Sequence, residues 1–175
     1  IKIIKKLLFN IIVISCVTAS YPETIASNGI VTSSNNLASS IGLDILKSGG
    51  NAIDAAVAVG FALAVVHPGA GNIGGGGFMV IRLANGEVTT IDFRETAPSK
   101  SSRDMFLDQN DNVIKDMSWN TIYSVGVPGT VGGLGYAHEK FGKLKWKKLV
   151  NPAKKIAHGG FDLDPFNASY LNSDY

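Results

Sequence analysis

Two stretches of this chain carry residue types that could bind a ligand, and the first is rich in glycine. Gly69–Gly77 has the sequence GAGNIGGGG, and its first six residues fit G-x-G-x-x-G, the pattern of a dinucleotide-binding turn. Such a turn needs a strand before it and a helix after it, because the pyrophosphate sits on the helix N-terminus. Here the helical pattern comes first, and no Gly-Lys-Ser/Thr follows. We therefore expect no nucleotide site.

A steric requirement can account for the glycine loop instead. A tight helix-to-strand crossing needs positive φ angles and close backbone approach, which glycine permits without strain. We expect this steric role, while a glycine loop beside a catalytic centre stays open.

The second stretch, Ile91–Glu95, has the sequence IDFRE and contains an arginine. Alternation along a strand divides it between two faces: Asp92 and Arg94 on one, and Ile91, Phe93 and Glu95 on the other. Arg94, at a strand end near the glycine loop, is suited to hold a substrate carboxylate in a bidentate fork. The alternative is a structural ion pair with Asp92 or Glu95, and residue physics alone favours that alternative.

Other catalytic patterns are missing. The three histidines do not have metal-ligand spacing, and His138-Glu139 does not continue as H-E-x-x-H. The sequence contains neither G-x-S-x-G nor S-x-x-K. We expect neither a metal nor a cofactor.

The elements that must position these residues follow from hydrophobic periodicity and capping signals. They are, in chain order, a helix Leu37–Lys47 capped by Asn35 or Asn36, a helix Ala52–Val66 capped by Asn51, strands Phe78–Leu83 and Val88–Arg94, a strand Tyr123–Val127, a helix capped by Thr130 and ending near Phe141, and two short helices around Trp146–Val150 and Pro152–His158. Helices and strands in mixed order, with an antiparallel pair, predict an α+β fold.

Turn signals connect these elements. Asn85-Gly86 between two β-rich runs predicts a hairpin. Residues 99–121 are polar and irregular, with one expected turn at Asp108–Asn112. Asn167-Ala168-Ser169 is a glycosylation sequon, which matters only in a eukaryotic source.

The first 19 residues have the layout of a secretory signal peptide. Lys2, Lys5 and Lys6 precede an apolar run, Leu7–Val17, that is short for a membrane span. We expect cleavage after Ala19, with residues 20–175 as the exported part. Val13-Ile14-Ser15-Cys16 also resembles a bacterial lipobox, so lipidation at Cys16, the single cysteine, stays open.

Charge gives no reason to propose a nucleic-acid partner. Of the 16 Lys and Arg residues, the three N-terminal lysines belong to the signal, which leaves 13 against 14 Asp and Glu. A nearly neutral body lacks the basic patch that attracts nucleic acid. The lysines around Trp146 are expected to be a solvated helix face.

Three long segments closely resemble the N-terminal part of γ-glutamyltransferases, also called glutathione hydrolases. They are "DILKSGGNAIDAAVAVGFALAVVHPGAGNIGGGGFMVIR", "IDFRETAPSKSSRDMFLD" and "VGVPGTVGG". The resemblance runs from about Gly29 to beyond Phe161, in order and at the spacing of the family.

The resemblance implies an N-terminal-nucleophile hydrolase with a four-layer αββα sandwich. Such precursors cut themselves into a large and a small subunit, and the new N-terminal threonine attacks the γ-glutamyl amide of glutathione. The resulting γ-glutamyl-enzyme passes its acyl group to water, an amino acid or a peptide. The arginine of the family's DFRE block, here Arg94, is implied to pair with the α-carboxylate of the glutamyl group.

The resemblance also implies that residues 20–175 are an incomplete N-terminal portion of the catalytic domain. The threonine nucleophile belongs to the missing C-terminal part, so we expect no catalytic residue in this chain and no activity from it alone. The expected partners are glutathione and other γ-glutamyl compounds, amino-acid or peptide acceptors, the rest of the large subunit and the small subunit. The expected location is the bacterial periplasm or outside the cell. A related acylase, a poly-γ-glutamate transpeptidase or an inactive remnant stay open as alternatives.

Overall fold

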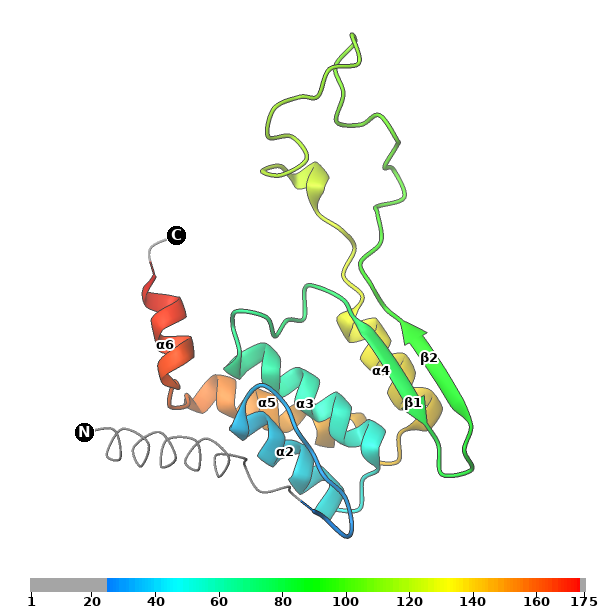
Figure 1. The fold of residues 1–175 in the computed structure, drawn as a ribbon, viewed down its shortest axis with the longest axis vertical. Helices are drawn as coiled ribbons and strands as arrows, with labels where there is room; N and C mark the ends of the chain where they lie inside the picture. Colours follow the sequence, from blue (N-terminus) through cyan, green and yellow to red (C-terminus); the bar gives the residue numbers. More distant parts are fainter. Residues whose placement is uncertain (1–24, 174–175) are drawn as a thin grey trace, which may run out of the picture. The chain divides into compact units, whose positions relative to one another are not determined.

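The computed structural model describes residues 25–173, so the predicted signal peptide, its cleavage after Ala19 and lipidation at Cys16 lie outside the described residues. The chain divides into residues 1–30 and residues 31–175, and every helix and strand below belongs to the second unit. In chain order they are α2 (Asn36–Lys47), α3 (Ala52–Val66), β1 (Phe78–Arg82), β2 (Val88–Asp92), the 3-10 turn η1 (Ile122–Ser124), α4 (Thr130–Phe141), α5 (Trp146–Gly159) and α6 (Pro165–Asn172) (Figure 1). The described part is therefore α+β, as predicted.

Helices α2 and α3 begin where the asparagine caps predict. The Asn35 side chain accepts hydrogen bonds from the first backbone N–H groups of α2, and the Asn51 side chain does the same for α3. Asp54 completes a capping box with Asn51. Helix α3 is apolar on nearly every side because it is central: it contacts α2, α4 and α5.

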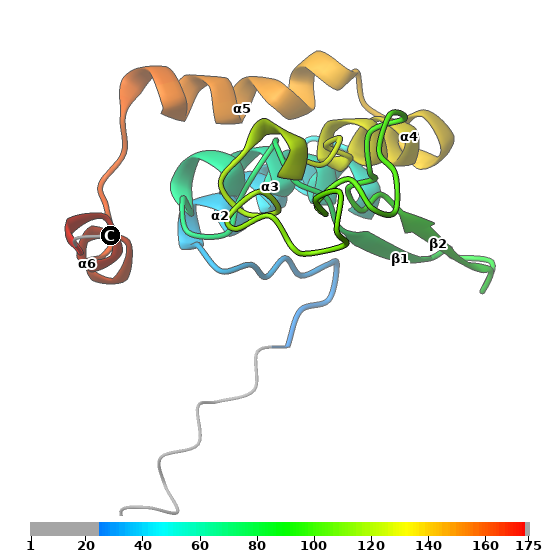
Figure 2. The same cartoon turned by 90° about the horizontal axis from the view of Figure 1, so that it is seen from above.

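The predicted hairpin is present, and it packs one face onto the helices. Strands β1 and β2 pair antiparallel, with Phe78 opposite Asp92, and Gly86 has a φ of 89° in the turn. Ile81 and Ile91 are 4% and 9% exposed on the inner face, where β2 contacts α4. The outer face is uncovered in the described residues, since Phe78 is 66% exposed and its neighbours on that face are similar: Val80 74% and Val88 60%. Figure 2 shows the hairpin lying alongside α4.

A long connecting segment, residues 93–129, separates β2 from α4 (Figure 1). This excursion contains less strand than predicted. The predicted strand Tyr123–Val127 is wrong: its start lies in η1, and only Val127 pairs, in an isolated bridge with Thr96. A strand needs a neighbour along its length, and none of the described residues supplies one. The predicted turn at Asp108 is confirmed, since its carboxylate accepts the backbone N–H groups of Asn110 and Asn112.

Two expectations about the later helices are corrected. Gly129, rather than Thr130, is the N-cap of α4, and Thr130 is the first helical residue. The two short basic helices are one helix, α5, with Pro152 inside it. Leu149 and Ala153 on either side of the proline are buried, and packing of α5 on α3 outweighs the hydrogen bond that proline cannot donate.

Helix α6 has no counterpart among the predicted elements, and it buries the asparagine of the sequon. The Asp164 carboxylate caps it by accepting the backbone N–H of Asn167 at 2.9 Å. Asn167 is 2% exposed, and its amide donates to the Val66 carbonyl at 3.2 Å and to the Asp164 carboxylate. The nitrogen that would carry a glycan is therefore engaged inside the protein.

None of the helices between residues 25 and 173 combines the length and apolarity needed to cross a membrane.

Candidate functional site

Arg94 lies two residues beyond β2, where the chain leaves the hairpin for the excursion. The residue before it still belongs to the ladder: the Phe93 N–H donates to the Gly77 carbonyl at 3.0 Å. The Arg94 N–H donates to the Asp92 carboxylate at 3.0 Å. On the other side, Thr96 and Val127 exchange two backbone hydrogen bonds of 3.3 and 2.8 Å. The backbone of Arg94 is therefore held on both sides.

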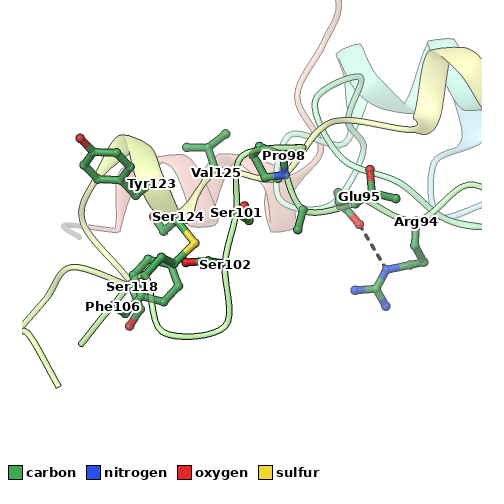
Figure 3. A pocket seen from close by; sticks show the side chains of 14 residues that line it. Arg94, Glu95, Pro98, Ser101, Ser102, Phe106, Ser118, Tyr123, Ser124 and Val125 are labelled. Carbon is green, nitrogen blue, oxygen red and sulfur yellow. Dashed lines mark hydrogen bonds and ion pairs between the residues drawn. The ribbon is translucent and has the colours of Figure 1, made fainter. Parts of the chain in front are cut away.

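The guanidinium of Arg94 is only partly engaged (Figure 3). Its Nε donates to the Glu95 carboxylate at 3.2 Å, and its Cζ lies 5.8 Å from the centre of the Phe78 ring. The side chain is 63% exposed. Among residues 25–173, no other side chain pairs with it, so the two terminal amino groups remain able to grip a carboxylate with two parallel hydrogen bonds.

The two interpretations of Arg94 are therefore compatible in geometry. The ion pair with Glu95 exists, but it uses Nε alone. Asp92 makes no ion pair with the guanidinium, since its carboxylate accepts the Arg94 backbone N–H. The predicted strand Val88–Arg94 is shorter in the structure, since β2 ends at Asp92, and the side chain of Glu95 is exposed.

The Arg94–Glu95 pair also affects the acidity of the glutamate. The pKa of Glu95 lies below its usual value, first because its carboxylate is hydrogen bonded to its own backbone N–H. Partial desolvation opposes this shift, and the hydrogen bond and charge of Arg94 add to it. Glu95 is therefore ionised throughout the neutral range and keeps Nε of Arg94 oriented.

A pocket of about 520 Å³ opens beside Arg94, between the start of the excursion and its return (Figure 3). Its wall mixes hydroxyl groups with apolar side chains: Ser101, Ser102, Ser118, Ser124 and Tyr123, together with Pro98, Met105, Phe106 and Val125. The lining residues include one cation, Arg94, and one anion, Glu95. Because Glu95 engages Nε of Arg94, the terminal amino groups of Arg94 are the part of this lining that could bind an anionic headgroup.

The glycine loop lies against Arg94, as framework. It joins α3 to β1, so the strand–loop–helix order of a dinucleotide site is absent from this described segment. A Cβ on Gly76 would lie 2.5 Å from the Phe93 carbonyl oxygen and 2.8 Å from the Arg94 Cα, and a Cβ on Gly71 would overlap the Leu63 carbonyl. Close approach therefore explains these glycines. The expected positive φ angles are not found, because the positive-φ glycines of the described residues lie outside Gly69–Gly77.

Asn72, the only polar side chain in the glycine loop, links this loop to the start of α4, and the sequence patterns did not single it out. Its Oδ1 accepts hydrogen bonds from the Gly75 N–H at 2.8 Å and from the Thr130 hydroxyl at 3.0 Å. A polar residue inside a glycine run that must pack closely is the signal that could have found it.

In the described part of the chain, no three His, Cys, Asp or Glu side chains gather in a way that could hold a metal ion.

Comparisons with known proteins agree with one another. The family model described as Gamma-glutamyltranspeptidase matches residues 38–175. The chain is 54% identical over 153 residues to a glutathione hydrolase proenzyme of Pseudomonas sp. (strain A14), which covers 87% of this chain and 27% of that protein. It is also 54% identical over 136 residues to a glutathione hydrolase proenzyme of Escherichia coli (strain K12), covering 78% of this chain and 23% of that protein.

A solved structure gives the same result. The gamma-glutamyltranspeptidase of Helicobacter pylori superposes with a TM-score of 0.80 at 51% identity, over 86% of this chain and 43% of that chain. Measured against the two proenzymes from Pseudomonas and Escherichia coli, the chain spans about a quarter of their length.

Proposed function

This chain belongs to the gamma-glutamyltranspeptidase family, and on that basis we propose that it is the N-terminal part of the large subunit of a glutathione hydrolase proenzyme. The match over residues 38–175, at 54% identity to two such proenzymes, supports the assignment. The chain covers only about a quarter of the length of those two proenzymes, which supports the proposal that it is one part of a larger enzyme.

In this proposal the full-length protein cuts itself, and a threonine from polypeptide beyond this chain becomes the nucleophile. The threonine oxygen bonds to the γ-carbonyl carbon of glutathione, the amide C–N bond breaks, and the threonine's proton passes through the free α-amine to the leaving amine. Water, or the amine of an amino acid or peptide, then attacks the γ-glutamyl-enzyme and restores the threonine hydroxyl.

Arg94 has the role of anchoring the glutamyl donor. The observation that supports this role is the pair of terminal amino groups that remain unpaired among the described residues, at the wall of a 520 Å³ pocket. A carboxylate held by both groups makes charge-assisted hydrogen bonds with a defined orientation. Glu95 leaves that end of the guanidinium free, because it occupies Nε.

The proposed fold of the whole enzyme is a four-layer αββα sandwich, in which the hairpin is part of one sheet. The uncovered outer face of β1 and β2 supports this, since Phe78, Val80 and Val88 are apolar and exposed in the described residues. In a sandwich, a second sheet covers such a face. The proposed partners are thus the remaining large-subunit segments and the small subunit.

The central test is Arg94→Ala in the full-length protein. We expect the KM for glutathione to rise about 10- to 100-fold, because a charge-assisted contact worth roughly 1.5–3 kcal/mol is lost. Self-cleavage into two subunits should stay intact, as judged by gel electrophoresis. Arg103→Ala is the matched control, since Arg103 is exposed and pairs with its neighbour Asp104 outside the pocket wall.

Two results would contradict the proposal. An unchanged KM in Arg94→Ala would remove the carboxylate role, and loss of self-cleavage instead would indicate a structural one. Faster turnover of a poly-γ-glutamate or of an acyl amide without the glutamyl headgroup would favour the related transpeptidase or acylase. Absence of any coding sequence for a threonine-bearing small subunit would favour an inactive remnant.

A further inference from the structure

Two glycines from different segments closely approach the backbone of Phe93 and Arg94. The first is Gly76 of the glycine loop, whose added Cβ would lie 2.5 Å from the Phe93 carbonyl oxygen and 2.8 Å from the Arg94 Cα. The second is Gly129 at the start of α4, whose added Cβ would overlap the same Phe93 carbonyl and would lie 3.1 Å from the Arg94 carbonyl oxygen. The loop and the start of α4 therefore pack against one short piece of backbone, and this packing positions the base of the arginine side chain.

The glycine loop and the start of α4 are joined first by backbone hydrogen bonds. The Gly75 carbonyl accepts from the Gly129 N–H at 2.8 Å and from the Thr130 N–H at 3.0 Å. This carbonyl takes the place of a capping side chain, because the N-cap Gly129 has none. The glycine loop is thereby attached to the first turn of α4.

One side-chain contact locks the same junction. Asn72 Oδ1 accepts from both the Gly75 N–H and the Thr130 hydroxyl, and its Nδ2 donates to the Ala70 carbonyl at 3.2 Å. Thr130 is 8% exposed, so its hydroxyl is shielded from most competing water. Gly76 and Gly129 have no side chains that could fix their positions. The Asn72–Thr130 hydrogen bond therefore holds the glycine loop against α4.

We propose that Asn72 and Thr130 are positioning residues that hold Arg94 in register for the substrate carboxylate. The inference rests on the proposed function of Arg94 and assigns the residues that act through it. A bidentate contact loses strength steeply with small displacements, so looser packing around the Arg94 backbone weakens carboxylate binding without removing the guanidinium.

The test uses a matched pair of variants in the full-length protein. Thr130→Val removes the hydroxyl and keeps the shape, whereas Thr130→Ser keeps the hydroxyl. We expect Thr130→Val to raise the KM for glutathione about 3- to 10-fold with little change in kcat, and Thr130→Ser to behave as the parent protein. Asn72→Ala should act in the same direction as Thr130→Val.

A double-mutant cycle identifies the route of the effect. In an Arg94→Ala background, Thr130→Val should add less than about 2-fold, because the residue through which it acts is gone. A full additional effect in that background would overturn the inference, as would an unchanged KM in Thr130→Val alone. Loss of self-cleavage in Thr130→Val, or a lowered unfolding temperature with a fall in kcat, would show a structural role and would also overturn it.

The cycle separates this inference from the proposed function. A strong effect of Arg94→Ala with a silent Thr130→Val removes the positioning role and leaves the substrate contact standing. A silent Arg94→Ala removes both.

Discussion

At the scale of single residues, the site depends on how one guanidinium divides its donors. Nε of Arg94 serves Glu95, and the terminal amino groups remain for a ligand. Since a carboxylate already occupies one edge, an incoming anion meets a cation that is oriented but only partly neutralised. The neighbouring ring of Phe78, 5.8 Å away, supports the same orientation through its π face.

The acidity of Glu95 gives a direct test of this arrangement. We expect carboxyl NMR titration to give Glu95 a pKa below that of an ordinary exposed glutamate. Because the pKa is depressed on folding, the stabilisation from ionised Glu95 is present above its unfolded pKa and is lost as the pH falls through the folded pKa. Arg94→Ala should raise the pKa only in part, since the hydrogen bond to the Glu95 backbone is the larger cause.

Arg103→Ala serves as the control, because Arg103 pairs with Asp104 and should leave the Glu95 titration unchanged. A pKa at or above that of an exposed glutamate would show that the pair does not persist in solution.

At the scale of elements, Asp54 ties the start of α3 to the chain after α4. It is fully buried, and its carboxylate accepts N–H groups from Asn51, Lys143 and Leu144 at 3.0–3.3 Å. The α2–α3 turn, the first turn of α3 and the α4–α5 connection therefore meet at one carboxylate.

Asp54→Ala should lower the free energy of unfolding of the full-length protein by at least about 2 kcal/mol, because buried N–H donors lose their acceptor. Hydrogen exchange should rise specifically at Lys143 and Leu144. Asp44→Ala on the exposed face of α2 is the matched control. Equal stability in both variants would mean that the buried carboxylate is not needed for this junction.

Local signals in the sequence were sufficient for some elements and insufficient for others. Asn35, Asn51 and Asn85-Gly86 correctly predict α2, α3 and the hairpin, because capping and turn chemistry act within a few residues. The single helix α5 depends on burying Leu149 and Ala153 against a distant helix, and Pro152 gives the opposite local signal. Tyr123–Val127 has strand-forming residues but no neighbouring strand among the described residues.

The site divides in the same way. Arg94 could be singled out from the end of a strand and the DFRE resemblance, and its role is still a prediction. Asn72 could be noticed only as the polar residue of the glycine loop, because its partner Thr130 lies 58 residues away in the chain. The glycines could be assigned to close packing, but not the partners that they approach.

At the scale of the whole molecule, the chain provides a helical core, one hairpin and an anchored arginine, about a quarter of the length of its curated relatives. In the proposed function, the nucleophile and the second sheet belong to the rest of the enzyme. On that proposal, this part binds one end of the donor while another segment performs the chemistry.

We propose that residues 1–19 direct the export of the protein and are then removed. We expect intact-mass analysis of the exported protein to place Ser20 at its N-terminus, because the residues before it have the small-residue pattern of a signal cleavage site. A diacylglyceryl group on Cys16 would instead show that the lipobox is used. An unprocessed N-terminus in the exported fraction would contradict both.

The buried amide of Asn167 limits how the protein can be made. In a yeast or mammalian secretory pathway, an oligosaccharide is attached to sequons while the nascent chain is still open. A copy modified there should not close α6 against the end of α3, because both hydrogens of this amide nitrogen are engaged, with the Val66 carbonyl and with the Asp164 carboxylate, and the sugar would replace one of them. In such hosts, molecules without the sugar should fold, and molecules that carry it should be degraded by quality control. Ser169→Ala removes the sequon, so all molecules of this variant should be sugar-free and should fold.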